Sequence, residues 1–269
     1  MKKISSLVLA AIVLLFSVTA FAGAPFNNLE GVGGVAFNPL AYPAGGKGDN
    51  EYVQNPQFGS WYVNLNQVDV NLSAIGISDT LFNRLELSYG FEAIGQQDAA
   101  NHNKHNIGAK LLLLSENFND INFLPAVSAG AIYKHTNHVA PGADHDGWDF
   151  YLVASKLITQ LPIPILISGG VLETSSYVTG VFGYDTDYKE TLFGNLDFVL
   201  GKYFIAGVEY KQGPKFDAFK NANYWDAHLA YTPNKNLTLI GAYVDAGDYK
   251  STDKVGLGNG VVLSAQYAF

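Results

Sequence analysis

The strongest constraint on the fold of this chain is a two-residue alternation of apolar and polar side chains that recurs through most of its length. In residues 81–92, for example, Leu85 and Leu87 fall on one face, whereas Glu86 and Ser88 fall on the other. Successive side chains of a β-strand point to opposite faces, so this pattern predicts strands with one apolar and one polar face. No stretch after the first 22 residues has the roughly 18 unbroken apolar residues of a membrane helix.

The same alternation runs to the last residue, with every second position apolar: Val261, Leu263, Ala265, Tyr267 and Phe269. The last strand of an outer-membrane barrel has to close the cylinder, and aromatic residues are enriched at its membrane interfaces. We therefore expect Tyr267 and Phe269 to form a C-terminal insertion signal at the periplasmic rim, recognised by the barrel-assembly machinery.

The first residues predict export by a signal peptide, residues 1–22. Lys2 and Lys3 precede an apolar core, and Ala20 and Ala22 supply the small residues of a cleavage site after residue 22. A membrane anchor is the weaker alternative because the apolar core is short. The expected location is the bacterial outer membrane, with lipid and lipopolysaccharide as surroundings.

Charge and cysteine content exclude several functions. Two of the 16 basic residues lie in the signal peptide and all 24 acidic residues follow it, so the mature chain has a net charge near −10. Nucleic-acid binding needs a basic surface and is excluded as a partner class. The chain has no Cys, which excludes a lipoprotein anchor, disulfides and thiol catalysis.

The pattern predicts an all-β, 12-stranded antiparallel transmembrane outer-membrane β-barrel. The predicted strands lie near 30–38, 59–77, 80–92, 106–115, 121–134, 148–159, 163–175, 190–200, 203–211, 223–231, 237–246 and 260–269. Short connections at 78–79, 116–120, 160–162, 201–202 and 233–236 alternate with long polar ones at 39–58, 93–105, 135–147, 176–189, 212–222 and 247–259. Short periplasmic turns and longer external loops are typical of outer-membrane barrels, and this assignment places both termini in the periplasm.

Residues 23–58 are the least certain part of this organisation, ahead of a barrel over 59–269. The glycines Gly31, Gly33 and Gly34 fit either a first strand followed by an external loop or a plug inside the lumen. Within 59–77 the apolar phase reverses near Asn66 and Gln67, which we interpret as a β-bulge.

Several segments resemble one family. They are the Gly-rich stretch 29–39, the stretches 106–111 and 124–134, and the C-terminal stretches 207–212, 234–239 and 242–245. The chain is similar here to a proteobacterial outer-membrane family, the domain of unknown function 3034 family. The resemblance implies a barrel but no substrate and no catalytic residues.

Strand parity predicts a set of charged side chains that line the lumen: Arg84, Glu86, Glu92, Lys110, Asp149, Asp197, Glu209, Asp226 and His228. One interpretation is a narrow pore with an acid-rich lining for small hydrophilic or cationic solutes. The other is a network of internal ion pairs that holds the barrel closed, because buried charges need partners.

Histidines cluster in two predicted external loops, His102 and His105 in one, and His135, His138 and His145 in the next. They are weak candidates for a metal site, since imidazole binds Zn²⁺, Cu²⁺ and Ni²⁺, and solvated polar loops are the alternative. No Gly-x-Ser-x-Gly motif is present, so we expect no catalytic residues and no cofactor. A passive channel is therefore the leading function, followed by a closed barrel that binds or supports through its loops, and then by a lipid-modifying enzyme.

Overall fold

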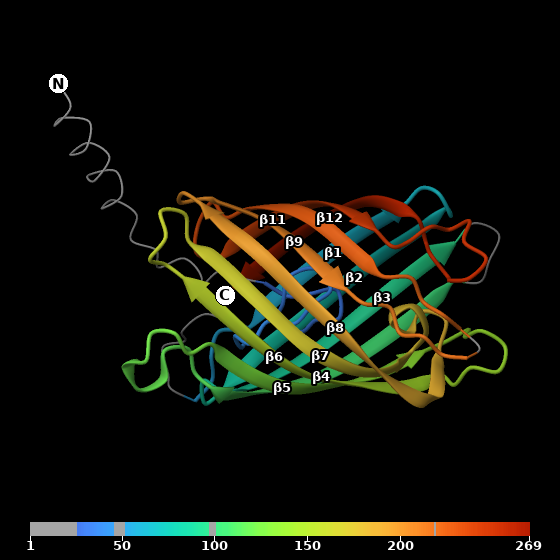
Figure 1. Cartoon of the computed structure of the whole chain (residues 1–269), viewed down its shortest axis with the longest axis horizontal. Coiled ribbons are helices and arrows are strands. Elements are labelled where there is room, and N and C mark those ends of the chain that lie inside the picture. The colour runs from blue at the N-terminus through green and yellow to red at the C-terminus, as the bar shows by residue number, and fades with distance from the viewer. Residues whose placement is uncertain (1–25, 46–51, 97–100, 218) are drawn as a thin grey trace, which may run out of the picture.

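The computed structural model describes residues 26–45, 52–96, 101–217 and 219–269, so the predicted signal peptide lies outside the described residues. Twelve strands form a closed barrel in which each strand pairs antiparallel with its neighbours and β1 pairs with β12 (Figure 1). The predicted 12-stranded antiparallel barrel is confirmed. The strands are β1 (Gln57–Leu65), β2 (Val70–Leu81), β3 (Leu85–Gln96), β4 (His102–Leu114), β5 (Ala126–Thr136), β6 (Asp146–Ile158), β7 (Ile165–Ser176), β8 (Tyr184–Leu200), β9 (Phe204–Lys211), β10 (Tyr224–Tyr231), β11 (Leu237–Asp245) and β12 (Asn259–Ala268).

The outer surface of the barrel is apolar. Outward-facing Ile107, Leu192 and Leu263 have more than half of their side-chain surface exposed, and the same parity continues around all twelve strands. Aromatic side chains are exposed near the strand ends, for example Trp225 and Tyr243 at one end and Phe58 and Tyr267 at the other. An apolar band between aromatic girdles is the surface that a lipid bilayer requires of a barrel. Among the described residues, no helix has the length and apolar character needed to cross a membrane.

The twelve strands are not divided as the sequence pattern predicts. The predicted strand at 59–77 is a hairpin of β1 and β2, joined by a turn at 66–69 in which Asp69 has a positive φ of 51°. The phase reversal at Asn66 and Gln67 therefore marks the turn and not a bulge. The predicted strand near 30–38 is not part of the barrel wall, so one strand lost and one gained leave the number unchanged.

The connections separate into two ends of the barrel. The end that holds the start of β1 and the end of β12 carries the connections 82–84, 115–125, 159–164, 201–203 and 232–236. The opposite end carries 66–69, 137–145, 177–183, 212–223 and 246–258, and it also holds the end of β3 and the start of β4. Ser78 and Asp79, predicted as a turn, lie within β2, and the turn follows at 82–84. Two short 3₁₀ turns occur in the connections, η1 (Phe118–Asp120) and η2 (Tyr177–Gly180).

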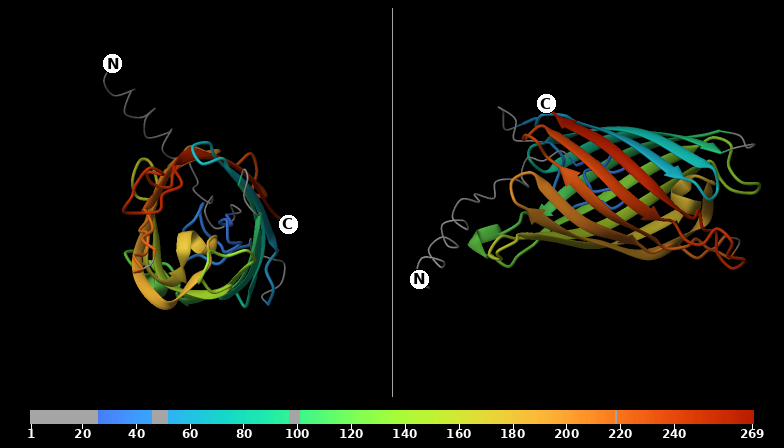
Figure 2. Two further views of the ribbon diagram at one scale, coloured as in Figure 1. Left: turned by 90° about the vertical axis from the view of Figure 1, so that its right-hand side faces the viewer. Right: turned by 90° about the horizontal axis from the view of Figure 1, so that it is seen from above.

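Residues 26–45 lie inside the barrel, and we call this segment the plug. In the end-on view the plug (blue) and the loop that contains η2 (yellow) both lie within the ring of strands (Figure 2). The plug folds on itself through isolated bridges between Asn27 and Gly33 and between Gly34 and Pro39. The predicted external loop at 39–58 is corrected in two parts: residues 39–45 belong to the plug, and Val53 bridges to Leu81 at the end of β2, whereas 46–51 lie outside the described residues.

Three glycines bring the plug backbone against the barrel wall. Gly76 of β2 and Gly90 of β3 are directly paired, and Gly31 of the plug lies over them. A Cβ atom on residue 90 would lie 2.3 Å from the carbonyl oxygen of Glu30, and one on residue 76 would lie 2.6 Å from the Cα of Gly31. Gly31 also has a φ of +85°, which glycine adopts without steric cost. The plug can take this position only because these positions have no side chain.

Candidate functional site

The barrel interior has two chemically different walls. Inward-facing side chains of β1, β2, β11 and β12 are mainly apolar, including Val63, Leu65, Val70 and Val262, and we call this the apolar wall. Inward-facing side chains of β3–β6 and β8–β10 include most of the buried charges, and we call this the charged wall: Glu86, Glu92, Lys104, Lys110, Lys134, Asp149, Asp197, Glu209, Lys211, Asp226 and His228. The plug lies between the two walls.

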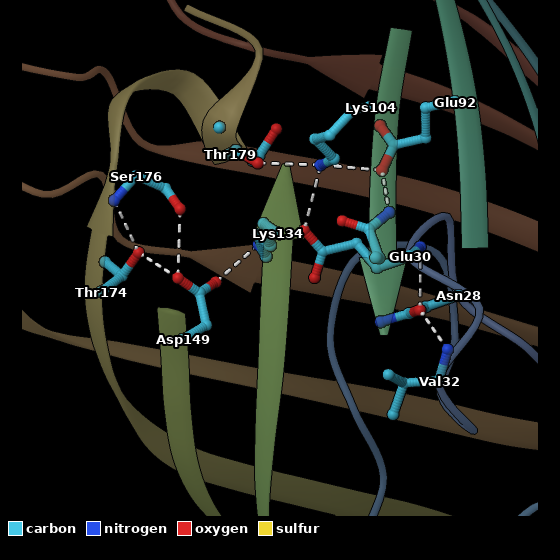
Figure 3. Close-up of polar contacts among 12 residues, drawn as sticks. Asn28, Glu30, Val32, Glu92, Lys104, Lys134, Asp149, Thr174, Ser176 and Thr179 are labelled. Atoms are coloured by element: carbon cyan, nitrogen blue, oxygen red, sulfur yellow. Dashed lines mark hydrogen bonds and ion pairs between the residues drawn. The ribbon is translucent and has the colours of Figure 1, made fainter. Parts of the chain in front are cut away.

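A carboxylate of the plug joins two lysines of the charged wall. Glu30 accepts from Lys104 Nζ at 3.3 Å and from Lys134 Nζ (Figure 3). Lys104 also pairs with Glu92 at 2.7 Å, and Lys134 pairs with Asp149 at 2.6 Å. Burial by itself would raise the pKa of the Glu30 carboxyl, but the two ammonium groups outweigh it and hold this pKa below its ordinary value. Glu30 is therefore an ionised plug residue within a buried network of ion pairs.

The local fold of the plug holds Glu30 in position. The Asn28 side-chain oxygen accepts from the backbone N–H groups of Glu30 and Val32, both at 3.0 Å. A hydrogen bond from a backbone N–H group to the side-chain oxygen of an Asn two residues earlier is typical of tight turns. On the wall side, Asp149 accepts from the hydroxyl groups of Thr174 and Ser176. Hydroxyl groups of β7 and the lysines of the ion pairs therefore donate to the carboxylates of this network, and Asn28 fixes the plug turn that carries Glu30.

A second network anchors the plug backbone. Glu86 accepts from the N–H groups of Gly33 at 2.8 Å and Ala44 at 2.7 Å. Lys110 pairs with Glu86 at 2.7 Å and donates to the carbonyl oxygens of Gly33 and Tyr42, both at 2.9 Å. One ion pair of the charged wall therefore supplies both donors and acceptors to the plug.

A third cluster is rich in acids and lies on β8–β10. Glu209 Oε2 accepts from the backbone N–H groups of Ala36 and Phe37 at 3.0 Å. His228 bridges Asp197 and Asp226 at 2.8 Å each, across the space that Gly207 leaves free. Glu209 Oε1 and Asp226 Oδ2 have no hydrogen-bond partner among the described residues. This part of the lumen therefore holds more acceptor atoms than donors.

The lumen is also covered at the end opposite the start of β1 and the end of β12. Residues 177–183, which we call the inner loop, fold into the barrel, and Val178 and Gly180 are buried. The carbonyl oxygens of Thr179 and Gly180 accept from Lys104 Nζ at 2.8 Å and from the Thr136 hydroxyl at 2.7 Å. Lys104 thus contacts both the plug and the inner loop, so the two closures of the lumen share one side chain.

Most of the predicted lumen-lining residues are buried and point inward: Glu86, Glu92, Lys110, Asp149, Asp197, Glu209, Asp226 and His228. Arg84 is a correction, because it is exposed in the 82–84 turn and donates to the carbonyl oxygen of Leu112 at 3.3 Å. Four further charged side chains are buried in the lumen but were not among the predicted lining residues: Glu30, Lys104, Lys134 and Lys211. Strand parity carried two residues further, from Asn106, would have found Lys104, and Lys211 lies on the Glu209 face at the end of the predicted strand 203–211.

The histidines do not share one loop surface. His102 and His105 lie in β4 and His135 in β5, whereas His138 and His145 lie in the 137–145 connection. His135 contacts His105 and His145, with ring centroids 6.5 Å and 6.3 Å apart. In the part of the chain that is described, no three His, Cys, Asp or Glu side chains are placed to hold a metal ion.

Comparison with known proteins places this geometry in a recognised class. The family described as protein of unknown function (DUF3034) matches residues 23–266. The KdgM porin superposes with a TM-score of 0.54 at 14% identity, covering 79% of this chain and 99% of that chain. The NanC porin has the same TM-score at 11% identity, covering 80% of this chain and 100% of that chain. A KdgM porin in complex with disordered oligogalacturonate has a TM-score of 0.52 at 13% identity, with 79% of this chain and 99% of that chain covered. No curated protein matches the chain. The fold is thus that of outer-membrane porins, in a family without an assigned function.

Proposed function

The chain belongs to the DUF3034 family, and we propose that it is an outer-membrane channel for small cationic or neutral polar solutes that its own plug keeps closed at rest. The porin fold supports a channel, and the occupied lumen supports a closed resting state. The proposal includes export by the signal peptide, and a barrel that spans the outer membrane among lipid and lipopolysaccharide after insertion by the assembly machinery.

One observation carries the solute preference. Four backbone N–H groups of the plug donate to only two wall carboxylates, those of Glu86 and Glu209. When the plug withdraws, these carboxylates lose their donors and face an open lumen, together with the unpartnered Oδ2 of Asp226. Rings of acidic side chains select for cations in channels. Ammonium, amide and hydroxyl groups of a passing solute can replace the departing N–H donors.

The lining of this barrel argues against an anionic substrate. Oligogalacturonate, bound by a KdgM porin, carries a carboxylate on each sugar unit. The charged wall here has six carboxylates against four lysines and one histidine, so it would repel a polyanion. The porin fold therefore supports a channel, whereas the lining chemistry supports a different solute class.

Planar-bilayer conductance of the full mature chain and of a variant lacking residues 26–45 tests the proposal. Every barrel strand lies after the deleted segment, so the barrel is expected to assemble without it. The intact protein should show few openings, and the deletion variant should show steady, cation-selective conductance. Glu209→Gln in the deletion background should reduce the cation selectivity. A folded deletion variant with no conductance, or with anion selectivity, would contradict the proposal.

A permanently closed barrel that binds partners through its external loops is the second candidate. The sealing of the lumen by both the plug and the inner loop favours it, because a simple pore needs neither. The two candidates differ in one result. A closed binding module would remain non-conducting at high voltage and in mild urea, whereas a plugged channel would open as the plug is released.

A further inference from the structure

A cavity inside the barrel lies against the apolar wall, between the plug and the inner loop. Its volume is about 110 Å³, and its lining combines three parts of the chain. The plug contributes Leu29, Ala36 and Phe37, the inner loop contributes Val181 and Phe182, and the remaining side chains come mainly from β1, β2, β11 and β12. The space is therefore bounded on two sides by the same two segments that close the lumen.

The lining chemistry offers water almost no hydrogen-bond partners. A buried water needs two to four polar partners, and an apolar cavity without them stays dry. Almost all of the lining atoms here are carbon. An engineered protein cavity of roughly 150 Å³ lined by Leu, Ile and Phe binds benzene or xenon, so a space of this size accepts a molecule of about one ring.

Two polar atoms at the edge of this lining have no partner. Tyr224 Oη and His102 Nδ1 are inaccessible to water and make no hydrogen bond with any described residue. Both residues belong to the cavity lining. Leaving a buried polar group unsatisfied is costly, and a ligand hydroxyl or carbonyl group would relieve that cost once either side chain turned its polar atom toward the cavity.

We propose that this cavity binds a small, uncharged, mainly apolar molecule, such as a monocyclic hydrocarbon carrying at most one hydroxyl or carbonyl group. The ligand would contact the plug on one side and the inner loop on the other. It would therefore stabilise the closed lumen, since withdrawal of either segment opens the site. This site is distinct from solute passage: it takes a second ligand class, on a lining drawn from the apolar wall, the plug and the inner loop.

The test uses the full mature chain in lipid nanodiscs, with benzene as the probe and benzoate as the charged counterpart. Methyl resonances of Val63, Leu65 and Val181 report on the cavity, and those of outward-facing Leu263 and Val261 report on partition into lipid. Saturable shifts of the first group with benzene, and none with benzoate, are expected. Shifts confined to the outward-facing group, or none at saturation, would overturn the proposal.

Two variants fill the cavity from different sides, Ala36→Phe from the plug and Val244→Phe from β11. Each should weaken benzene binding at least tenfold. Ala265→Phe, on the outward face of β12, is the matched control and should leave binding unchanged. If Ala36→Phe displaces the plug, Val244→Phe still decides the question. Binding of equal affinity in Val244→Phe and the unsubstituted protein would overturn the proposal, whatever the conductance of either.

Discussion

At the scale of single residues, Lys134 is the side chain on which the central ion-pair network most depends. Its ammonium group is fully buried and pairs with both Glu30 and Asp149. Removing one partner of a buried ion pair typically costs about 3–5 kcal/mol because it leaves an uncompensated charge in a low dielectric. Lys134→Met should therefore lower the free energy of unfolding by roughly that amount, measured by urea titration of the refolded barrel.

Lys156→Met provides the matched control for that prediction. Lys156 pairs with Glu116 at 3.2 Å, but both side chains are partly exposed to solvent. Partly exposed pairs contribute about 0–1 kcal/mol, so this variant should unfold close to the unsubstituted protein. Equal losses in the two variants would mean that the Lys134 network has no special role in stability.

At the scale of elements, the contact between the plug and the β2–β3 hairpin decides whether the lumen is closed. Gly90→Leu would place a side chain where the Glu30 carbonyl now lies, 2.3 Å from the new Cβ atom. Overpacking of this kind costs about 1–3 kcal/mol. Because the barrel wall is held by twelve strand pairs, the plug should yield, and the ratio of closed to open channels should fall about five- to 150-fold.

Bilayer conductance measures this change directly, as open probability at a fixed voltage. Gly241→Leu is the control, since Gly241 is exposed on β11 and a Cβ atom there would meet nothing within 4 Å. The control should conduct as little as the unsubstituted protein. If Gly90→Leu stays closed while folding normally, the glycine contact does not hold the plug.

The β1–β2 hairpin shows why strand boundaries were harder to predict than strand number. Alternation over 59–77 looks like one long strand because apolar residues continue through Val68 and Val70. The turn residues Asn66 to Asp69 carry no Gly or Pro, and the reversal of side-chain phase was the single visible sign of the turn. A phase reversal is produced equally by a bulge and by a tight hairpin, so local sequence cannot separate the two.

At the scale of the whole molecule, the alternation of apolar and polar side chains and the spacing of the connections were enough to predict a closed barrel. The alternation depends only on which face of each strand contacts lipid, so it is visible in the local sequence. The plug and the charged wall were less predictable. Glu30 meets Lys134 across 104 positions of sequence, and nothing near either residue specifies that contact. The inner loop belongs to the predicted polar connection at 176–189, although Val178, Val181 and Phe182 make it largely apolar and thus suited to burial. Long-range ion pairs of this kind require the three-dimensional register of the strands.

The distribution of connections also predicts the orientation of the barrel in the outer membrane. The longer connections 212–223 and 246–258 share one end, and short ones such as 232–236 share the end that holds the start of β1. Because outer-membrane barrels expose their longer loops to the outside, the first end should face the medium. The chain has no cysteine, so single cysteines can report this without background labelling.

Thr252→Cys, in the 246–258 connection, should react with a membrane-impermeant maleimide on intact cells. Lys235→Cys, in the 232–236 connection, should react only after the outer membrane is opened. Both positions are exposed, so accessibility to solvent is matched and the membrane is the remaining barrier. The reverse labelling pattern would mean that the barrel has the opposite orientation, with the start of β1 at the cell surface. Labelling of both cysteines on intact cells would show that the outer membrane does not separate the two ends of the barrel.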